Sequence, residues 1–122
     1  MPRDTLLRAW LGQQVAVVIV RPMGSSHPEH PNTIYPVNYG YLPGTQAGDE
    51  DPVDVYLLGV SVPVSSCLGE VIAIIVRHDD IEDKLVVVPA GTRMTSEQIR
   101  EAVMFQEQYF DIEVVMAVDQ HI

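Results

Sequence analysis

Three aspartates lie close together in the segment GDEDPVDVYLLG (48–59), directly before an apolar run. They are Asp49, Asp51 and Asp54. Carboxylates this close repel one another, and one or more of them takes up a proton unless a cation joins them. The cluster is therefore either a solvated loop, where the repulsion costs little, or a metal-binding segment. Spacing alone leaves both interpretations open.

A second acidic segment, HDDIEDK (78–84), follows another apolar run and ends at Lys84, the only lysine of the chain. Its carboxylates belong to Asp79, Asp80, Glu82 and Asp83. In an extended chain Glu82 and Lys84 face one side and Asp83 faces the other. We expect the two acidic segments, each at a strand end, to converge on one mouth of a β-barrel.

Converging carboxylates suit metal-assisted phosphoryl transfer. Mg²⁺ takes oxygen ligands and usually keeps several waters, so carboxylates from separate loops fit it. Paired metal ions lower the pKa of a shared water and neutralise the oxygens of an in-line displacement. A carboxylate that is not a metal ligand could then accept the proton of the water. Because acidic residues are also common in turns, the pattern by itself does not separate a site from a solvated surface.

The overall charge restricts the partners. The chain has 122 residues, with 7 basic and 17 acidic side chains, a net charge of −10 and a pI near 4.5. Such a surface repels nucleic acid and anionic membranes, so we expect neither as a partner, and it suits the binding of divalent cations. The length predicts a single domain over 1–122. With Cys67 as the only cysteine and no apolar run long enough to span a bilayer, we expect a cytoplasmic protein.

The segments that must position these residues are mostly β-prone. Runs rich in Val and Ile predict strands at 14–21, 53–60, 70–78 and 84–90, with a short strand at 37–42 and loops at 22–36, 43–52 and 61–69. Five short strands with long loops predict a small OB-like barrel. The β-prone run at 112–118 could return to the sheet.

One segment changes to a helical period. Thr95 and Gln98 form a capping-box pattern, and apolar residues recur at helical spacing up to Phe110, which predicts a helix over 96–110. The predicted fold class is therefore a β-dominated α+β domain: a five-stranded OB-like barrel with one packed C-terminal helix.

The segment YPVNYGYLPGTQAGDEDPVDVYLLG (35–59) closely resembles the soluble family I inorganic pyrophosphatases, whose signature D-x-D-P-x-D follows a YP-x-NYGY segment. EDKLVVVP (82–89) and FQEQYFDIE (105–113) resemble the second acidic strand and the C-terminal helix end of that family. The resemblance covers most of the chain from about 14 to 113 and marks it as a short, divergent member. It implies an OB-like barrel, Mg²⁺ dependence, and hydrolysis of inorganic diphosphate to two orthophosphates through a metal-bridged water.

The resemblance also implies site roles. Asp49 and Asp54 would be metal ligands, Asp51 the base for the attacking water, and Tyr39, Tyr109 and Lys84 phosphate ligands. For the remaining metal ligands, Glu82 is preferred to Asp83 and Asp80 to Asp79, although the shorter loop leaves this register open. Because bacterial members are commonly homohexamers, the resemblance further implies a homo-oligomer.

Several positions depart from the family pattern. The first predicted strand lacks the Lys and Glu expected to point into the site, and Phe110 stands where a lysine is expected. Glu82 replaces the usual aspartate, and His27 and His30 occupy a loop where a basic residue is expected. A charge-assisted hydrogen bond contributes roughly 1.5–3 kcal/mol, so losing two or three cations could cost on the order of 10³-fold in rate or affinity. Arg21 could compensate in part by donating two parallel hydrogen bonds to a phosphate.

Two other functions therefore remain alongside an inorganic diphosphatase. A metal-dependent hydrolase of another small diphosphate compound would place an organic group where cations are missing. A non-catalytic binding module would keep the barrel and a vestigial site.

Overall fold

The computed structural model describes residues 7–44, 52–80 and 82–117. Its elements, in chain order, are β1 (Gln14–Arg21), β2 (Asn38–Leu42), β3 (Val53–Leu57), β4 (Ser66–Arg77), β5 (Lys84–Val88), α2 (Ser96–Glu107) and β6 (Ile112–Met116). All five predicted barrel strands, the helix and the last strand are present, although β3 and β5 end earlier than predicted and α2 ends before Phe110. Neither this helix nor any other helical stretch within those residues has the length and apolar character needed to cross a membrane.

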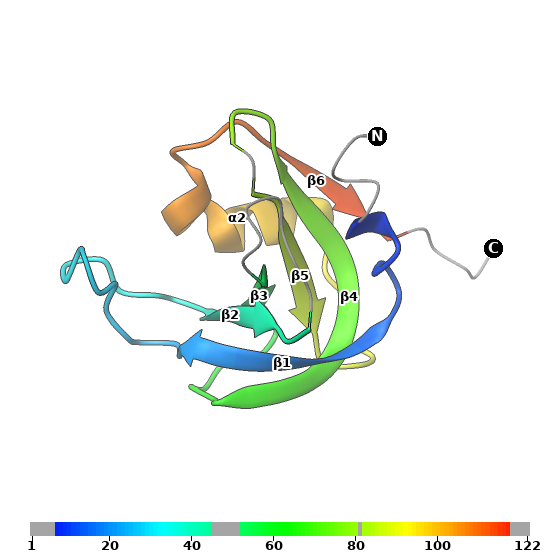
Figure 1. The fold of residues 1–122 in the computed structure, drawn as a ribbon, viewed down its shortest axis with the longest axis horizontal. Helices are drawn as coiled ribbons and strands as arrows, with labels where there is room; N and C mark the ends of the chain where they lie inside the picture. Colours follow the sequence, from blue (N-terminus) through cyan, green and yellow to red (C-terminus); the bar gives the residue numbers. More distant parts are fainter. Residues whose placement is uncertain (1–6, 45–51, 81, 118–122) are drawn as a thin grey trace.

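The strands form a sheet in the order β1-β2-β3-β5-β4, and pairing between β1 and β4 closes it into a barrel (Figure 1). The β3–β5 pairing is parallel and the others are antiparallel. β6 pairs with the second half of β4, outside the five-stranded ring. The predicted five-stranded OB-like barrel with one helix is therefore confirmed.

Strand β4 is longer than its sequence suggests. The prediction of a loop over 61–69 is wrong from Ser66 onward, because SCLG pairs with β1, with Ala16 opposite Leu68 and Val18 opposite Ser66. Ser and Gly have weak strand propensity, but a strand position is decided mainly by its pairing partners. Cys67 consequently lies in a strand and not in a loop.

The apolar residues form two cores, one on each side of the barrel wall. One face of the strands fills the barrel with side chains that include Val55, Leu57 and Leu85. The alternate face carries Tyr56, Val86 and others, and packs against Ile99 and Val103 of α2. Because side chains alternate along a strand, β2, β3, β4 and β5 each supply both cores, whereas the buried residues of β1 belong to the barrel interior. Burying Ile99 and Val103 stabilises the domain by about 1.5–3 kcal/mol per side chain.

Helix α2 begins as predicted. Thr95 is its N-cap and accepts a hydrogen bond from the Gln98 backbone N–H, while the Gln98 side chain accepts one from the Thr95 N–H. The helix buries Ile99, Val103 and Glu107 on one face. A carboxylate therefore occupies the last position of the buried stripe.

Two residues of the NYGY segment have structural roles. A Cβ on Gly40 would lie 1.8 Å from the carbonyl oxygen of Val18, so only glycine fits where β2 meets β1. The buried Asn38 side chain accepts hydrogen bonds from the N–H groups of Met23 and Val64 and donates one to the Val62 carbonyl. Asn38 thereby joins two loops to the start of β2.

Candidate active site

A cavity of about 630 Å³ lies where the second core meets solvent. Its lining residues come from β2 to β5, the end of α2 and the segment between β1 and β2: His27, His30, Thr33, Tyr39, Asp54, Arg77, Glu82, Lys84, Phe105, Gln106, Tyr109 and Phe110. Five of these residues are among the predicted site residues. The cavity therefore brings together the two acidic segments and the helix end.

The location differs from the predicted barrel mouth. Asp54 alternates with Val53 and Val55, which point into the barrel, and Lys84 precedes Leu85, which also points inward. The site residues therefore face outward. They lie at one end of the strands, since Lys84 begins β5 and Arg77 ends β4. Strand alternation thus puts the site on the outer wall of the barrel, beside α2.

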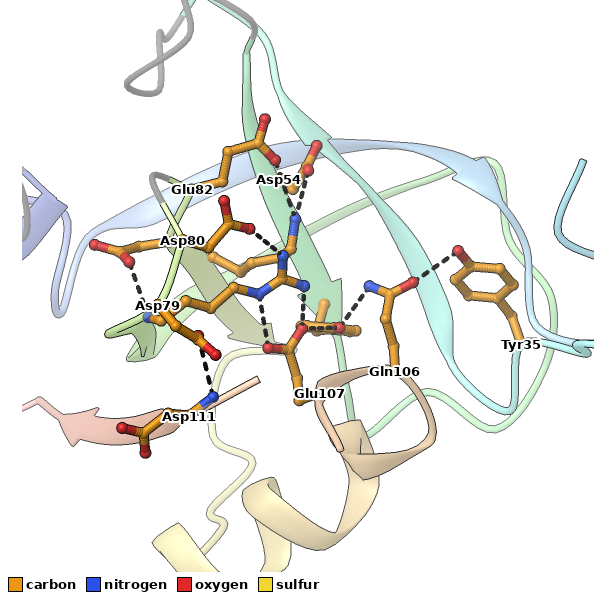
Figure 2. A network of polar contacts seen from close by, with 12 residues as sticks. Tyr35, Asp54, Asp79, Asp80, Glu82, Gln106, Glu107 and Asp111 are labelled. Carbon is orange, nitrogen blue, oxygen red and sulfur yellow. Dashed lines mark hydrogen bonds and ion pairs between the residues drawn. The ribbon is translucent and has the colours of Figure 1, made fainter. Parts of the chain in front are cut away.

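Lys84 connects the two acidic segments. Its ammonium nitrogen lies 2.7 Å from Oδ2 of Asp54 and 3.7 Å from Oε2 of Glu82. Figure 2 shows the Asp54 and Glu82 carboxylates side by side, on the same side of the network. Lys84 itself is buried, whereas both carboxylates are partly exposed to the cavity. The two acidic segments therefore supply one shared site.

The other acidic residues of the second segment point elsewhere. Asp83 is buried and accepts a hydrogen bond from the Arg77 backbone N–H, so it faces away from Glu82 and Lys84, as the strand alternation predicts. Asp79 accepts a hydrogen bond from the Asp111 backbone N–H. Asp80 does not line the cavity and instead pairs with Arg77 at 3.0 Å. Its proposed metal role requires a change of partner.

Tyr39 forms part of the cavity wall next to Asp54. Burial strongly raises the pKa of its hydroxyl, and the charge and hydrogen bond of Asp54 raise it further. The hydroxyl consequently keeps its proton throughout the physiological range. It is a permanent hydrogen-bond donor beside the carboxylate.

A hydrogen-bond chain links β1 to the end of α2, and Figure 2 shows its part from Tyr35 to Glu107. Arg21 Nη1 donates to the Tyr35 hydroxyl at 2.6 Å, and Tyr35 donates to Gln106 Oε1 at 3.0 Å. Gln106 Nε2 donates to the Tyr56 hydroxyl at 2.7 Å, and Tyr56 donates to Glu107 Oε2 at 2.6 Å. Every donor points along the chain toward Glu107, so the bonds polarise one another.

These hydrogen bonds fix the position of Arg21. Its guanidinium bonds to Tyr35 and lies 6.0 Å from the centre of the Tyr39 ring, but it does not line the cavity. Direct phosphate contact by Arg21 therefore stays a prediction. The observed contacts stabilise the wall around Tyr35 and Tyr39.

The predicted residues at the cavity edge are more exposed. Tyr109 lines the cavity with 76% of its surface exposed. His27 and His30 lie on the segment between β1 and β2, which extends away from the barrel in Figure 1, and their ring centres are 4.9 Å apart. Asp49 and Asp51 lie outside the described residues.

The donor chemistry of the cavity fits a hard divalent cation. Within residues 7–44, 52–80 and 82–117, no three His, Cys, Asp or Glu side chains gather closely enough to hold a metal ion. Two carboxylates do converge, because Asp54 and Glu82 share the ammonium of Lys84. Oxygen ligands of this kind, completed by water, suit Mg²⁺. Asp54 and Glu82 would therefore hold part of its coordination shell.

Sequence reasoning overlooked Arg77 and Glu107. Arg77 ends an apolar strand, yet it is only 5% exposed and binds Glu107 with both Nε and Nη2. Glu107 continues the four-residue spacing of Ile99 and Val103. An acidic residue in the buried stripe of a helix is a signal for a buried partner.

A family model described as inorganic pyrophosphatase matches residues 15–113. The chain belongs to the inorganic pyrophosphatase family. The match includes every candidate site residue discussed above. The resemblance inferred from the NYGY and DEDPVD segments is confirmed.

Curated relatives in this family include inorganic pyrophosphatases from Mesorhizobium japonicum and Rickettsia prowazekii. The first is 35% identical over 65 residues, 50% of this chain and 37% of the relative. The second is 32% identical over 95 residues, 65% of this chain and 55% of the relative. The chain thus spans between about a third and just over half of the length of these pyrophosphatases.

Solved pyrophosphatases share the fold. The inorganic pyrophosphatase from Ehrlichia chaffeensis superimposes with a TM-score of 0.67 at 21% identity, covering 88% of each chain. An inorganic pyrophosphatase from Neisseria gonorrhoeae gives a TM-score of 0.60 at 25% identity, covering 80% of this chain and 74% of that one. The barrel and its helix are therefore those of the pyrophosphatase fold.

Proposed function

We propose that this protein hydrolyses inorganic diphosphate to two orthophosphates with the help of Mg²⁺. The observation that carries this proposal is the single cavity in which Asp54, Glu82, Lys84 and Tyr39 converge, in a chain of the pyrophosphatase family. Two acidic segments on opposite sides of the barrel would have excluded such chemistry.

In this proposal the side chains divide into metal ligands and phosphate ligands. Asp54 and Glu82 hold Mg²⁺, with Asp49 and Asp80 as further ligands. Bound Mg²⁺ supplies charge neutralisation at the phosphate oxygens and lowers the pKa of water. Lys84, as a compact point charge, and the hydroxyl of Tyr39 bind phosphate oxygens, and Tyr109 donates from the cavity edge.

Asp51 is the proposed general base. A water oxygen attacks one phosphorus, the bond from that phosphorus to the bridging oxygen breaks, and the electron pair leaves with the second phosphate. Asp51 accepts the proton released by the attacking water. Bonding of Lys84 to the phosphate oxygens stabilises the negative charge that builds up in the transition state.

The decisive experiment measures orthophosphate release from diphosphate with and without Mg²⁺. Wild type should release orthophosphate only with Mg²⁺, and Asp51→Asn should abolish release without changing the melting temperature. Asp111→Asn is the matched control, because this exposed residue does not line the cavity. No Mg²⁺-dependent release from diphosphate would contradict the proposal.

A second substrate class is favoured by the apolar part of the cavity wall. Phe105, Phe110, His27 and His30 are among the residues that line the cavity, whose volume of about 630 Å³ leaves room for an organic group beside two phosphates. A diphosphate ester would place that group against the rings. Turnover of esters without turnover of inorganic diphosphate would favour this function, and no release from either would indicate a non-catalytic binding module.

Self-association and a cytoplasmic location stay predictions. Sedimentation of the purified chain tests the first, with a homohexamer as the expected arrangement.

A further inference from the structure

We propose that Arg77 is a phosphate-binding residue of this cavity, held in a fixed orientation by Glu107 and Phe110. This inference rests on the proposed function in one respect: the ligand it assigns to Arg77 is the phosphate of the substrate or product. It concerns a residue that the sequence motifs do not single out.

Arg77 is an unusual residue for its position. It ends β4 and its side chain is almost completely buried, yet the residue lines the cavity with Lys84 and Tyr109. Of the described residues that line the cavity, Arg77 and Lys84 are the two that carry a lysine or arginine charge. Lys84 is shared between Asp54 and Glu82. A diphosphate in the cavity would therefore meet a second cation at Arg77.

Glu107 fixes the orientation of this guanidinium. Arg77 Nε donates to Oε1 of Glu107 at 2.8 Å, and Nη2 donates to Oε2 at 2.6 Å, which is the bidentate geometry of a strong pair. Glu107 is fully buried, and its Oε2 also accepts the hydrogen bond of Tyr56. A side chain held at two nitrogens loses little further freedom when it binds a ligand.

Phe110 covers one face of the guanidinium. The central carbon of Arg77 lies 3.7 Å from the centre of the Phe110 ring, which is a close cation–π contact. Phe110 lines the same cavity, so the ring and the cation form one surface. Arginine stacks on aromatic faces and binds phosphate with its remaining edge, a combination that lysine does not reproduce.

The guanidinium keeps its charge in this buried place. Burial alone would lower the pKa of Arg77, but the hydrogen bonds and charge of Glu107, and then the hydrogen bond of Asp80, raise it above its ordinary value. The positive charge is therefore present at every pH at which the fold persists.

The contact with Asp80 shows that Arg77 also donates to an anionic oxygen other than those of Glu107. Nη1 donates to Oδ2 of Asp80 at 3.0 Å, and the Asp80 side chain is 29% exposed. A carboxylate and a phosphate present similar oxygens to arginine. We infer that a phosphate oxygen takes the place of Asp80, or joins it, when a ligand enters the cavity.

The test compares binding and turnover in matched variants. Inorganic phosphate is titrated calorimetrically into wild type, Arg77→Lys, Phe110→Leu and the control Arg93→Lys, an exposed arginine outside this cavity. Arg77→Lys should weaken phosphate binding and raise KM for diphosphate by about 10–100-fold. Phe110→Leu, which keeps the Arg77–Glu107 pair, should weaken phosphate binding by about 2–5-fold. Arg93→Lys should match wild type.

The outcomes separate this inference from the proposed function. Phosphate affinity and KM unchanged in both Arg77→Lys and Phe110→Leu would overturn it. If wild type releases no orthophosphate from diphosphate but its phosphate binding still depends on Arg77, the proposed function fails and the inference stands. Should Arg77→Lys not fold, because Glu107 loses its bidentate partner, phosphate binding by Phe110→Leu decides the question.

Discussion

The ammonium nitrogen of Lys84 lies 2.7 Å from Oδ2 of Asp54 and also faces Glu82, so an internal cation joins the carboxylates proposed to bind Mg²⁺. A metal ion and this ammonium carry the same sign of charge. The metal ion and the ammonium therefore compete for the same carboxylate oxygens, or repel each other when both are bound to those oxygens.

Lys84→Met should separate metal binding from phosphate binding. Removing the internal cation should tighten Mg²⁺ binding to the free protein on the order of tenfold, or ~1.4 kcal/mol, while hydrolysis of diphosphate falls. Titration calorimetry with Mg²⁺ measures the first effect and orthophosphate release the second. Arg93→Met, which removes a cation outside the cavity, should change neither. Weaker Mg²⁺ binding in Lys84→Met would show that the lysine supports the metal site.

His27 should contribute a hydrogen bond to the ligand. The Glu29 backbone N–H donates to Nδ1 of His27 at 3.0 Å, so the neutral ring carries its proton on Nε2. Since His27 lines the cavity, His27→Ala should raise KM for diphosphate by about 2–10-fold, the range for one neutral hydrogen bond. His78→Ala is the control, because His78 pairs with Glu113 and does not line the cavity. An unchanged KM in His27→Ala would show that His27 makes no contact with the substrate.

Stability should fall at alkaline pH, in part because of Tyr39. Burial, and then Asp54, raise the pKa of Tyr39 in the folded state. A raised pKa stabilises the fold fully below about pH 10, the ordinary tyrosine value. Above that pH the unfolded state releases its proton while the folded state retains it, so the free energy of unfolding decreases. Tyr39→Phe should lose stability less steeply between neutral and strongly alkaline pH in urea unfolding, and an equal slope would contradict this account.

The capping box of α2 offers a test of stability without touching the cavity. Thr95→Ala should lower the free energy of unfolding by about 0.5–2 kcal/mol, since the Gln98 N–H loses its acceptor. Ser96→Ala, one residue into the helix, should change it little. A cycle with Gln98→Ala measures the coupling between the two side chains, and additive effects would mean that the reciprocal bonds do not cooperate.

Regular patterns explain what the sequence could predict of the fold. Val- and Ile-rich runs identified β1, β3 and β5, and the capping box identified the start of α2. The first residues of β4 escaped prediction because their strand character comes from pairing with β1, a contact distant in sequence. The outward position of the site also depends on which face of each strand is enclosed when the barrel closes.

The site was predictable where a motif carried it. Tyr39, Asp54, Glu82, Lys84 and Tyr109 come from segments that resemble the family, and they line one cavity. Arg77 was assigned no site role, because an arginine at a strand end is ordinary and its partner lies 30 residues away on a helix. Only the tertiary fold places Glu107 beneath it.

Because Glu107 pairs with Arg77, one short segment both attaches the helix to the barrel and supplies residues of the candidate site. Gln106, Glu107, Tyr109 and Phe110 all lie at or just beyond the end of α2, and each meets the barrel or lines the cavity. Transient detachment of this segment would remove Gln106, Tyr109 and Phe110 from the cavity wall while leaving the barrel strands paired. A bound anion should therefore slow amide hydrogen exchange at the helix end far more than in β1 or β2. On heating, activity should be lost at a lower temperature than the one at which the barrel unfolds.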